Sequence, residues 1–303
     1  MNSQPRIKGI LLVIIGAMLW GVSGTVAQFL FQKKGFSAEW LVVIRLLVSG
    51  LILLVYTFTK GNHDIWKIWK SKHNCWSLIV FSIIGMLGVQ YTYFAAIKYG
   101  NAPTATILQY LSSVIIVCYL MICNKKLPSK QEIIAIVLAM VGTFFIITKG
   151  NIHTISISKL ALFWGISSAF AAAFYTLQPR YLLAKYGSTL IVGWGMLIGG
   201  VAFSFIHQPW DFTGNWSVSS IFAVIFVVLF GTIIAFCCYL ESLKYIQPTE
   251  TSVLSSVEPL SSAFLSLFWL HVPFGLPEWT GTVCIIVTII ILSRVKNQDE
   301  QIN

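Results

Sequence analysis

Ten long apolar runs, separated by short polar breaks, limit what this chain can fold into more than any other feature. Hydrophobic residues make up 57% of the 303 residues and charged residues only 10%, whereas soluble domains carry about 25% charged residues. A helix of about 20 apolar residues spans the hydrocarbon core of a bilayer. The sequence therefore predicts an all-α integral membrane protein with ten transmembrane helices. Their ranges are Ile10–Phe31, Trp40–Phe58, Ser77–Ile97, Thr104–Cys123, Ile133–Thr148, Leu160–Gln178, Leu190–Ile206, Val218–Leu240, Ser252–Leu270 and Trp279–Ser293.

The basic residues lie mainly in every second break between these runs. With a cytoplasmic N-terminus, fourteen Lys and Arg residues fall in cytoplasmic segments and five in external loops. Such a bias sets the orientation of membrane proteins. It predicts that both termini are cytoplasmic, and it explains the net charge of +10 without a nucleic-acid partner.

A short phrase occurs twice in the chain, as YFAAIKYGNAPT at 93–104 and YLESLKYIQPTE at 239–250. With an offset of 146, Tyr93 aligns with Tyr239 and Lys98 with Lys244. We interpret the chain as two five-helix halves, residues 1–150 and 151–303. Because five is odd, the second half starts on the opposite side of the membrane. This arrangement is the inverted repeat that recurs in secondary transporters.

Several motifs make the chain similar to the EamA-type members of the drug/metabolite transporter superfamily. They are MLWGVSG at 18–24, AAIKYGNAPTATIL at 95–108 and SLKYIQPTETSVLSSVEPLSSAF at 242–264. The resemblance covers nearly the whole chain and implies ten helices with both termini inside the cell. It also implies a central substrate cavity lined by the first, third, fourth, sixth, eighth and ninth helices. The expected location is the bacterial cytoplasmic membrane.

Ionisable residues at membrane depth are costly and are usually paired or functional. Glu258 lies inside the ninth run and precedes Pro259. Its carboxylate could attract a cation or accept a proton, or it could cap backbone groups that the proline leaves free. Arg45 lies inside the second run, where the resemblance favours an ion pair or a backbone contact over substrate binding.

Polar and aromatic residues inside four of the runs predict the lining of the cavity. Tyr hydroxyls and Gln amides need hydrogen-bond partners in a membrane interior, and a hydrated cavity supplies them. The predicted substrate-binding residues are Trp20, Gln90, Tyr91, Gln109, Tyr110, Trp164, Tyr175 and Glu258.

An aromatic cavity that is poor in Lys and Arg favours an organic cation, because the faces of aromatic rings attract positive charge. We therefore expect a secondary transporter in the lipid bilayer that takes up a small organic cation by alternating access, holding it in an aromatic cage, with choline as the favoured solute. The chain also resembles the choline-permease branch of the family, found in bacteria that decorate teichoic acid or lipopolysaccharide with phosphocholine. The alternative is an exporter of amino acids, drugs or other small metabolites.

Other classes of function lack a motif in the sequence. The five His residues are scattered and form no HExxH pattern, which argues against an enzyme. The six Cys residues form no CxxC pair with a neighbouring His, so no metal and no cofactor is expected. A scaffold or sensor that carries out no transport is a further alternative.

Overall fold

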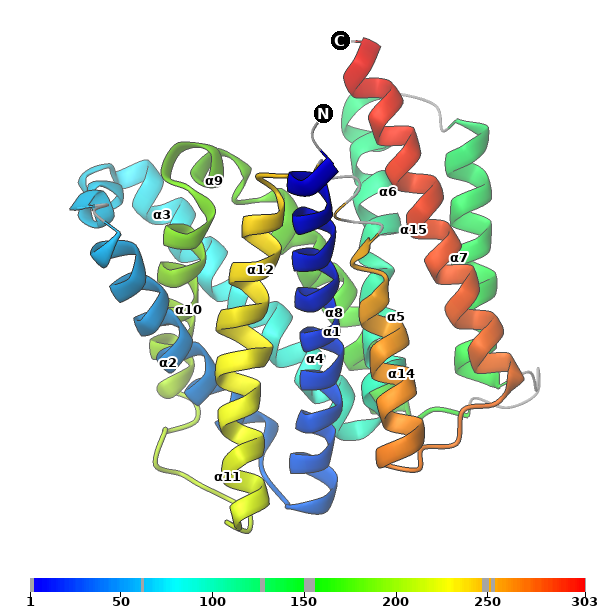
Figure 1. Ribbon diagram of the computed structural model, residues 1–303, viewed down its shortest axis with the longest axis horizontal. Coiled ribbons are helices and arrows are strands. Elements are labelled where there is room, and N and C mark those ends of the chain that lie inside the picture. The colour runs from blue at the N-terminus through cyan, green and yellow to red at the C-terminus, as the bar shows by residue number, and fades with distance from the viewer. Residues whose placement is uncertain are drawn as a thin grey trace.

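The chain is folded into a bundle of helices, as Figure 1 shows. This computed structural model describes residues 3–60, 63–125, 129–149, 156–246, 251 and 254–302. Within these ranges the regular elements are all helices, so the predicted all-α class is confirmed. The two ends of the chain lie on the same side of the bundle, as they must when the number of crossings is even.

The helices follow one another with short connections. Up to residue 148 they are α1 (Ser3–Lys33), α2 (Ala38–Thr59), η1 (His63–Lys70), α3 (Lys72–Val80), η2 (Phe81–Leu87), α4 (Gly88–Tyr99), α5 (Ala102–Tyr110), α6 (Ser112–Asn124) and α7 (Lys130–Thr148). From residue 159 they are α8 (Lys159–Leu177), α9 (Arg180–Tyr186), α10 (Ser188–Ser204), α11 (Val218–Ile225), η3 (Phe226–Ile234), α12 (Ala235–Ser242), α14 (Val257–Trp269) and α15 (Leu276–Ile302).

Seven helical stretches in the described residues are long and apolar enough to cross a membrane. They are Pro5–Lys33, Ala38–Thr59, Lys72–Tyr99, Ala102–Cys123, Lys130–Thr148, Lys159–Leu177 and Val218–Ser242. Two shorter apolar helices, Ser188–Ser204 and Leu276–Leu292, and the 13-residue α14 coincide with the other three predicted runs. The total of ten crossings remains a prediction. The predicted boundary at residues 150 and 151, and the predicted start of the ninth run at Ser252, lie outside the described residues.

Polar residues in the breaks start the helices that follow them. The side chain of Ser37 accepts a hydrogen bond from the N–H of Trp40, and the side chain of Asn101 accepts one from the N–H of Thr104. Ser129 and Glu132 form a reciprocal capping box at the start of α7. Such caps satisfy backbone donors that lack an intrahelical partner, so these breaks fix where the helices begin.

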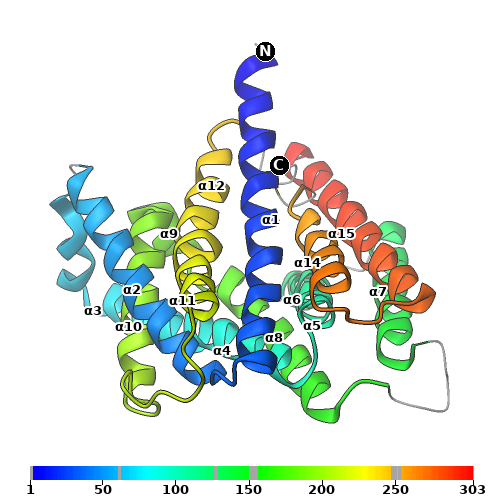
Figure 2. The ribbon, with the colours of Figure 1, turned by 60° about the horizontal axis from the view of Figure 1, so that its bottom comes forward.

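The most extensive helix contacts are those of α2 with α10 and of α7 with α15. The α7 and α15 helices lie together at one edge of the bundle, as Figure 2 shows. Their backbones meet at two glycines: a Cβ atom built on Gly142 would lie 2.8 Å from the carbonyl oxygen of Gly281. At the same end, Lys149 and Glu278 form an ion pair at 3.2 Å. These contacts make α7 and α15 a tight peripheral pair.

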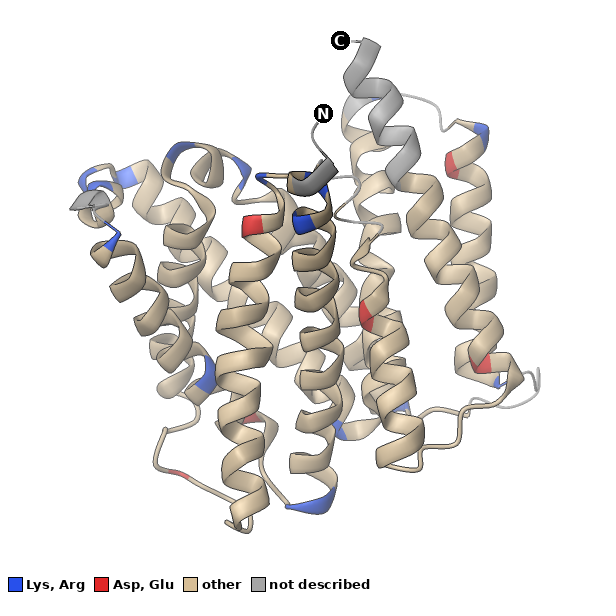
Figure 3. Ribbon diagram, in the orientation of Figure 1, with Lys and Arg blue, Asp and Glu red and all other residues tan. Residues whose placement is uncertain are grey.

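Lys and Arg residues gather at the end of the bundle where both termini lie, as the blue segments of the ribbon in Figure 3 show. This end includes η1, the start of α3, and α9. At the opposite end, where α5 and α11 begin, Lys98 pairs with Glu39 at 3.3 Å. The asymmetry of charge seen in the sequence is therefore an asymmetry between the two ends of the folded molecule.

Candidate functional site

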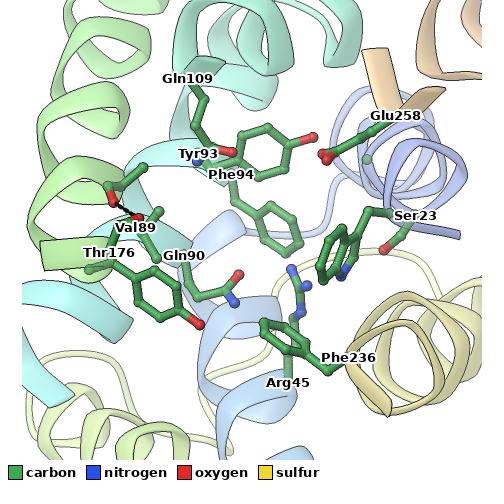
Figure 4. Close-up of a pocket in the computed structure, with 14 residues that line it drawn as sticks. Ser23, Arg45, Val89, Gln90, Tyr93, Phe94, Gln109, Thr176, Phe236 and Glu258 are labelled. Carbon is green, nitrogen blue, oxygen red and sulfur yellow. Dashed lines mark hydrogen bonds between the residues drawn. The ribbon is translucent and has the colours of Figure 1, made fainter. Parts of the chain in front are cut away.

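A cavity of about 210 Å³ lies within the helical bundle. Its walls come from α1, α2, α4, α5, α8, α12 and α14. This set includes the six helices that the family resemblance implies and adds α2 through Arg45. The lining residues, most of which are labelled in Figure 4, are Trp20, Ser23, Gly24, Arg45, Val89, Gln90, Tyr93, Phe94, Gln109, Ala172, Tyr175, Thr176, Phe236 and Glu258. Pockets for drug-sized ligands are about 300–1,000 Å³, so this cavity suits a smaller solute.

Glu258 supplies the acidic group of the cavity. It lies in the first turn of α14, where a carboxylate interacts favourably with the N-terminal end of the helix dipole. Pro259 fits in this turn because its missing N–H would have no intrahelical partner. The single O–H of Tyr110 lies within hydrogen-bond distance of two acceptors, Glu258 Oε2 at 3.1 Å and the carbonyl of Ser255 at 2.9 Å, and donates to one or the other. Within the described residues, Glu258 Oε1 has no hydrogen-bond partner, which leaves it able to bind a solute.

Arg45 supplies the basic group. Its side chain is buried, and its Nε donates to Thr232 Oγ1 at 2.5 Å while its Nη2 donates to the carbonyl of Gly231 at 3.2 Å. The guanidinium also lies 4.9 Å from the ring centre of Phe94, within the range of a cation–π contact. No carboxylate of the described residues forms an ion pair with it. Arg45 therefore contacts the backbone, one of the two roles that the family resemblance favoured, and also reaches the cavity.

Aromatic rings form much of the remaining wall. The ring of Trp20 packs edge-on against Phe236, with 5.2 Å between ring centres, and lies 5.2 Å from Tyr239. The ring of Tyr175 lies 5.4 Å from that of Phe81. The hydroxyl of Tyr93 is 2.8 Å from Thr106 Oγ1. These contacts hold the rings in place and leave their other surfaces to the cavity.

Five of the predicted binding residues line the cavity, namely Trp20, Gln90, Gln109, Tyr175 and Glu258. Tyr110 lies beside it and contacts Glu258. Tyr91 and Trp164 lie elsewhere: their rings pack edge-on against each other at 5.3 Å, and Tyr91 also contacts Phe203 at 5.1 Å. Adjacent residues of an α-helix differ by about 100° around its axis, and on α4 the cavity lies on the side of Val89 and Gln90 while Tyr91 faces Trp164 and Phe203.

Sequence reasoning missed other lining residues, chiefly Ser23, Tyr93, Phe94 and Phe236. Tyr93 was visible as the first residue of the repeated phrase, and its partner in the repeat, Tyr239, contacts Trp20. The two Phe residues resemble ordinary packing residues in an apolar run, so nothing in the sequence marks them. In the described part of the chain, no three His, Cys, Asp or Glu side chains come together as a metal site would require.

One family model matches most of the chain, and two relatives are named as transporters. A sequence model of the EamA-like transporter family matches residues 7–148 and residues 159–294. The chain is 42% identical over 286 residues to an uncharacterized inner membrane transporter, YicL, of Salmonella typhimurium, covering 94% of this chain and 95% of that protein. It is 25% identical over 261 residues to the uncharacterized transporter YyaM of Bacillus subtilis, covering 82% of each chain.

A solved structure, described only as the crystal structure of a protein, has the same fold. It aligns with 99% of this chain and 100% of its own, with a TM-score of 0.64 and 14% sequence identity. At that identity the likeness concerns the fold alone.

Proposed function

This chain belongs to the EamA-like transporter family, and from this premise we propose that it moves a small organic cation across the membrane by alternating access. Choline is the solute that we favour. The observation that carries the proposal is the carboxylate of Glu258 in a cavity walled by Trp20, Tyr93 and Phe236. A trimethylammonium group offers no hydrogen-bond donor, and aromatic faces bind it through cation–π contacts. A cation that moves inward gains about 2.3 kcal/mol per 100 mV of membrane potential.

Export of amino acids is the second candidate, and one observation favours it. Arg45 lines the same cavity as Glu258, so a solute with both a carboxylate and an ammonium group would find a partner for each. Guanidinium groups bind carboxylates with directed hydrogen bonds. Thr232 and Gly231 already accept hydrogen bonds from two of the five N–H donors of Arg45. Because Arg45 is partly engaged in this way, we favour the cation.

A comparison of choline with 3,3-dimethylbutanol, its uncharged carbon isostere, tests the proposal. We expect choline to raise the melting temperature of the purified transporter, because a ligand that binds only the folded state stabilises it. The isostere has the same shape and no charge, so we expect it to shift the melting temperature far less. Uptake of labelled choline into proteoliposomes is the functional counterpart. Equal stabilisation by both compounds would contradict the cation site, and stabilisation by amino acids alone would favour the second candidate.

The proposed topology places both termini in the cytoplasm and makes the two halves an inverted repeat. Its support is the gathering of Lys and Arg at one end of the bundle, seen in Figure 3. We predict that a single Cys replacing the exposed Lys70, at the end of η1, does not react in intact cells with a membrane-impermeant thiol reagent. A Cys replacing Trp216, half exposed at the opposite end, is expected to react. The reverse pattern would overturn the topology.

A further inference from the structure

In the part of the chain that the structure describes, two segments of π-helix interrupt the spanning helices. In η2 the N–H of Gly88 points to the carbonyl of Ile83, and in η3 the N–H of Ala235 points to the carbonyl of Phe230. Each bond reaches back five residues instead of four. Such segments are rare and lie frequently at functional sites.

The two π-helices occupy matching positions in the sequence. Adding the repeat offset of 146 to the bounds of η2 gives 227–233, which lies inside η3. The same offset takes Gly85 to Gly231. The packing also corresponds, because η2 lies against α10 while η3 lies against α2. Each half of the chain therefore carries one π-helix at the same place.

Both glycines allow close contact with a helix that lines the cavity. A Cβ built on Gly85 would lie 3.4 Å from the Cα of Tyr175 and 3.1 Å from the ring of Phe81. A Cβ built on Gly231 would overlap the Oγ and Cβ of Ser23. Tyr175 and Ser23 are themselves lining residues. At Gly231 the contact with α1 is therefore one that a larger residue would push apart, while at Gly85 a Cβ would meet α8 at an ordinary van der Waals distance.

Several backbone carbonyls of η3 accept hydrogen bonds from side chains. Arg45 donates to the carbonyl of Gly231 and Ser49 to that of Val228, both from α2. Thr232 Oγ1 donates to the carbonyl of Val227, five residues earlier, at 2.9 Å. Buried carbonyls need such partners, so α2 supports the π geometry of η3 directly.

Cavity-lining residues follow directly after each π-helix. Gln90 and Tyr93 come after η2, and Phe236 comes after η3. A π-helical turn holds about one residue more than an α-helical turn. Compared with an uninterrupted α-helix, a π-helical turn therefore shifts every following side chain around the helix axis by the angle of one residue, roughly 100°.

We propose that η2 and η3 are a matched pair of positioning elements, one in each half, that set which side chains of α4 and α12 face the cavity. In an uninterrupted α-helix of the same length, the position of Gln90 would be taken by Val89, and the position of Phe236 would be taken by Ala235. The inference goes beyond the proposed function and does not depend on the identity of the solute.

The test removes or adds one residue in the π-helix and reads the orientation of the helix directly. On a Cys-less background, a single Cys is placed at position 90 or at position 91 and treated with a small polar thiol reagent. In the full-length chain we expect Cys at 90 to react and Cys at 91 to be protected. Deletion of Ile83, which is 42% exposed on the outside of the bundle, removes the residue that η2 accommodates, so η2 should return to α geometry and Cys at 90 should still react. Insertion of one Ala after Ile83 adds a residue that η2 does not accommodate, so it should turn position 90 away from the cavity and protect Cys at 90. The matched control, Ile83→Ala, keeps the chain length and should keep the original pattern.

The same experiment applies to the other half, with deletion of Leu229 or insertion of one Ala after it, Leu229→Ala as the control, and single Cys residues at 236 and 237. Unchanged labelling in insertion variants that fold, or loss of labelling at 90 or 236 in deletion variants that fold, would overturn the proposal. A third variant needs no change of length: Gly231→Ala should alter the labelling of Cys at 236, because its Cβ overlaps Ser23. Adding Ser23→Gly, which removes the overlapping atoms, should restore it. If Gly231→Ala leaves the labelling at 236 unchanged, the positioning role fails even where the deletion variants do not fold.

Discussion

Glu258→Gln is expected to weaken choline binding by about thirtyfold or more while leaving the shape of the cavity intact. Loss of one partner from a buried pair of charges costs about 2–5 kcal/mol, and each 1.4 kcal/mol is about tenfold in Kd. The amide oxygen can still accept a hydrogen bond from Tyr110, whose Oη lies 3.1 Å from Glu258 Oε2. The loss would therefore report the charge itself. Titration of the melting temperature with choline, together with uptake into proteoliposomes, measures the effect.

The matched control is Glu241→Gln. Glu241 is also on a membrane helix, but it lies at the end of α12, where it pairs with Lys244 at 2.7 Å and its side chain is 40% exposed. Exposed pairs contribute about 0–1 kcal/mol, so choline binding should hardly change. Normal binding and uptake by Glu258→Gln would assign this carboxylate a structural role and remove the acidic half of the proposed site.

Trp20→Leu should weaken choline binding by about thirtyfold, because a desolvated cation–π contact contributes about 2 kcal/mol or more. Leucine keeps the apolar character of the wall and lacks a π-face. Trp20→Phe retains a smaller ring and should lie between Leu and the native residue. Isothermal titration of the purified variants gives the three dissociation constants. The uncharged isostere should bind with similar weak affinity to all three.

Trp164→Leu is the control for this series. Trp164 packs against Tyr91 and Phe163 outside the cavity lining, so the same substitution should lower stability without a specific loss of choline affinity. A larger effect at Trp164 than at Trp20 would mean that the solute binds between α4 and α8 at the Tyr91 contact, as the sequence first suggested.

The helices themselves were predictable because apolar length and polar breaks both leave a clear mark on the sequence. Ser129 and Glu132 begin α7 by local hydrogen bonds, and local chemistry of this kind can be read without a structure. The π-helices could not be predicted in this way. Phe81–Leu87 and Phe226–Ile234 are as apolar as their surroundings, and the extra residue in each turn changes no composition.

The sequence predicted how far along each helix the site lies, and it predicted only in part which face of each helix lines the cavity. Trp20, Gln90, Gln109, Tyr175 and Glu258 were chosen because they are polar or aromatic residues inside the predicted apolar runs, and all five line the cavity. Tyr91 was chosen for the same reason, yet it faces Trp164 and Phe203. The direction in which a side chain points from a helix depends on the geometry of all the turns before it. The π-helix η2 lies just before Tyr91 and changes that direction. Phe236 follows η3 and was missed for a similar reason.

The pairing of α2 with α10 and of α7 with α15 bears on how such a chain can originate. In the proposed repeat, each pair joins a helix to its own counterpart in the other half. Contacts between equivalent surfaces are what a two-fold homodimer makes. A single five-helix chain that inserted into the membrane in both orientations could therefore have made these contacts as a homodimer, before any duplication of its gene. Joining two such genes end to end would require only the connection from α7 to α8. After that fusion the two copies could diverge, which is how a cavity can acquire Arg45 from one half and Glu258 from the other.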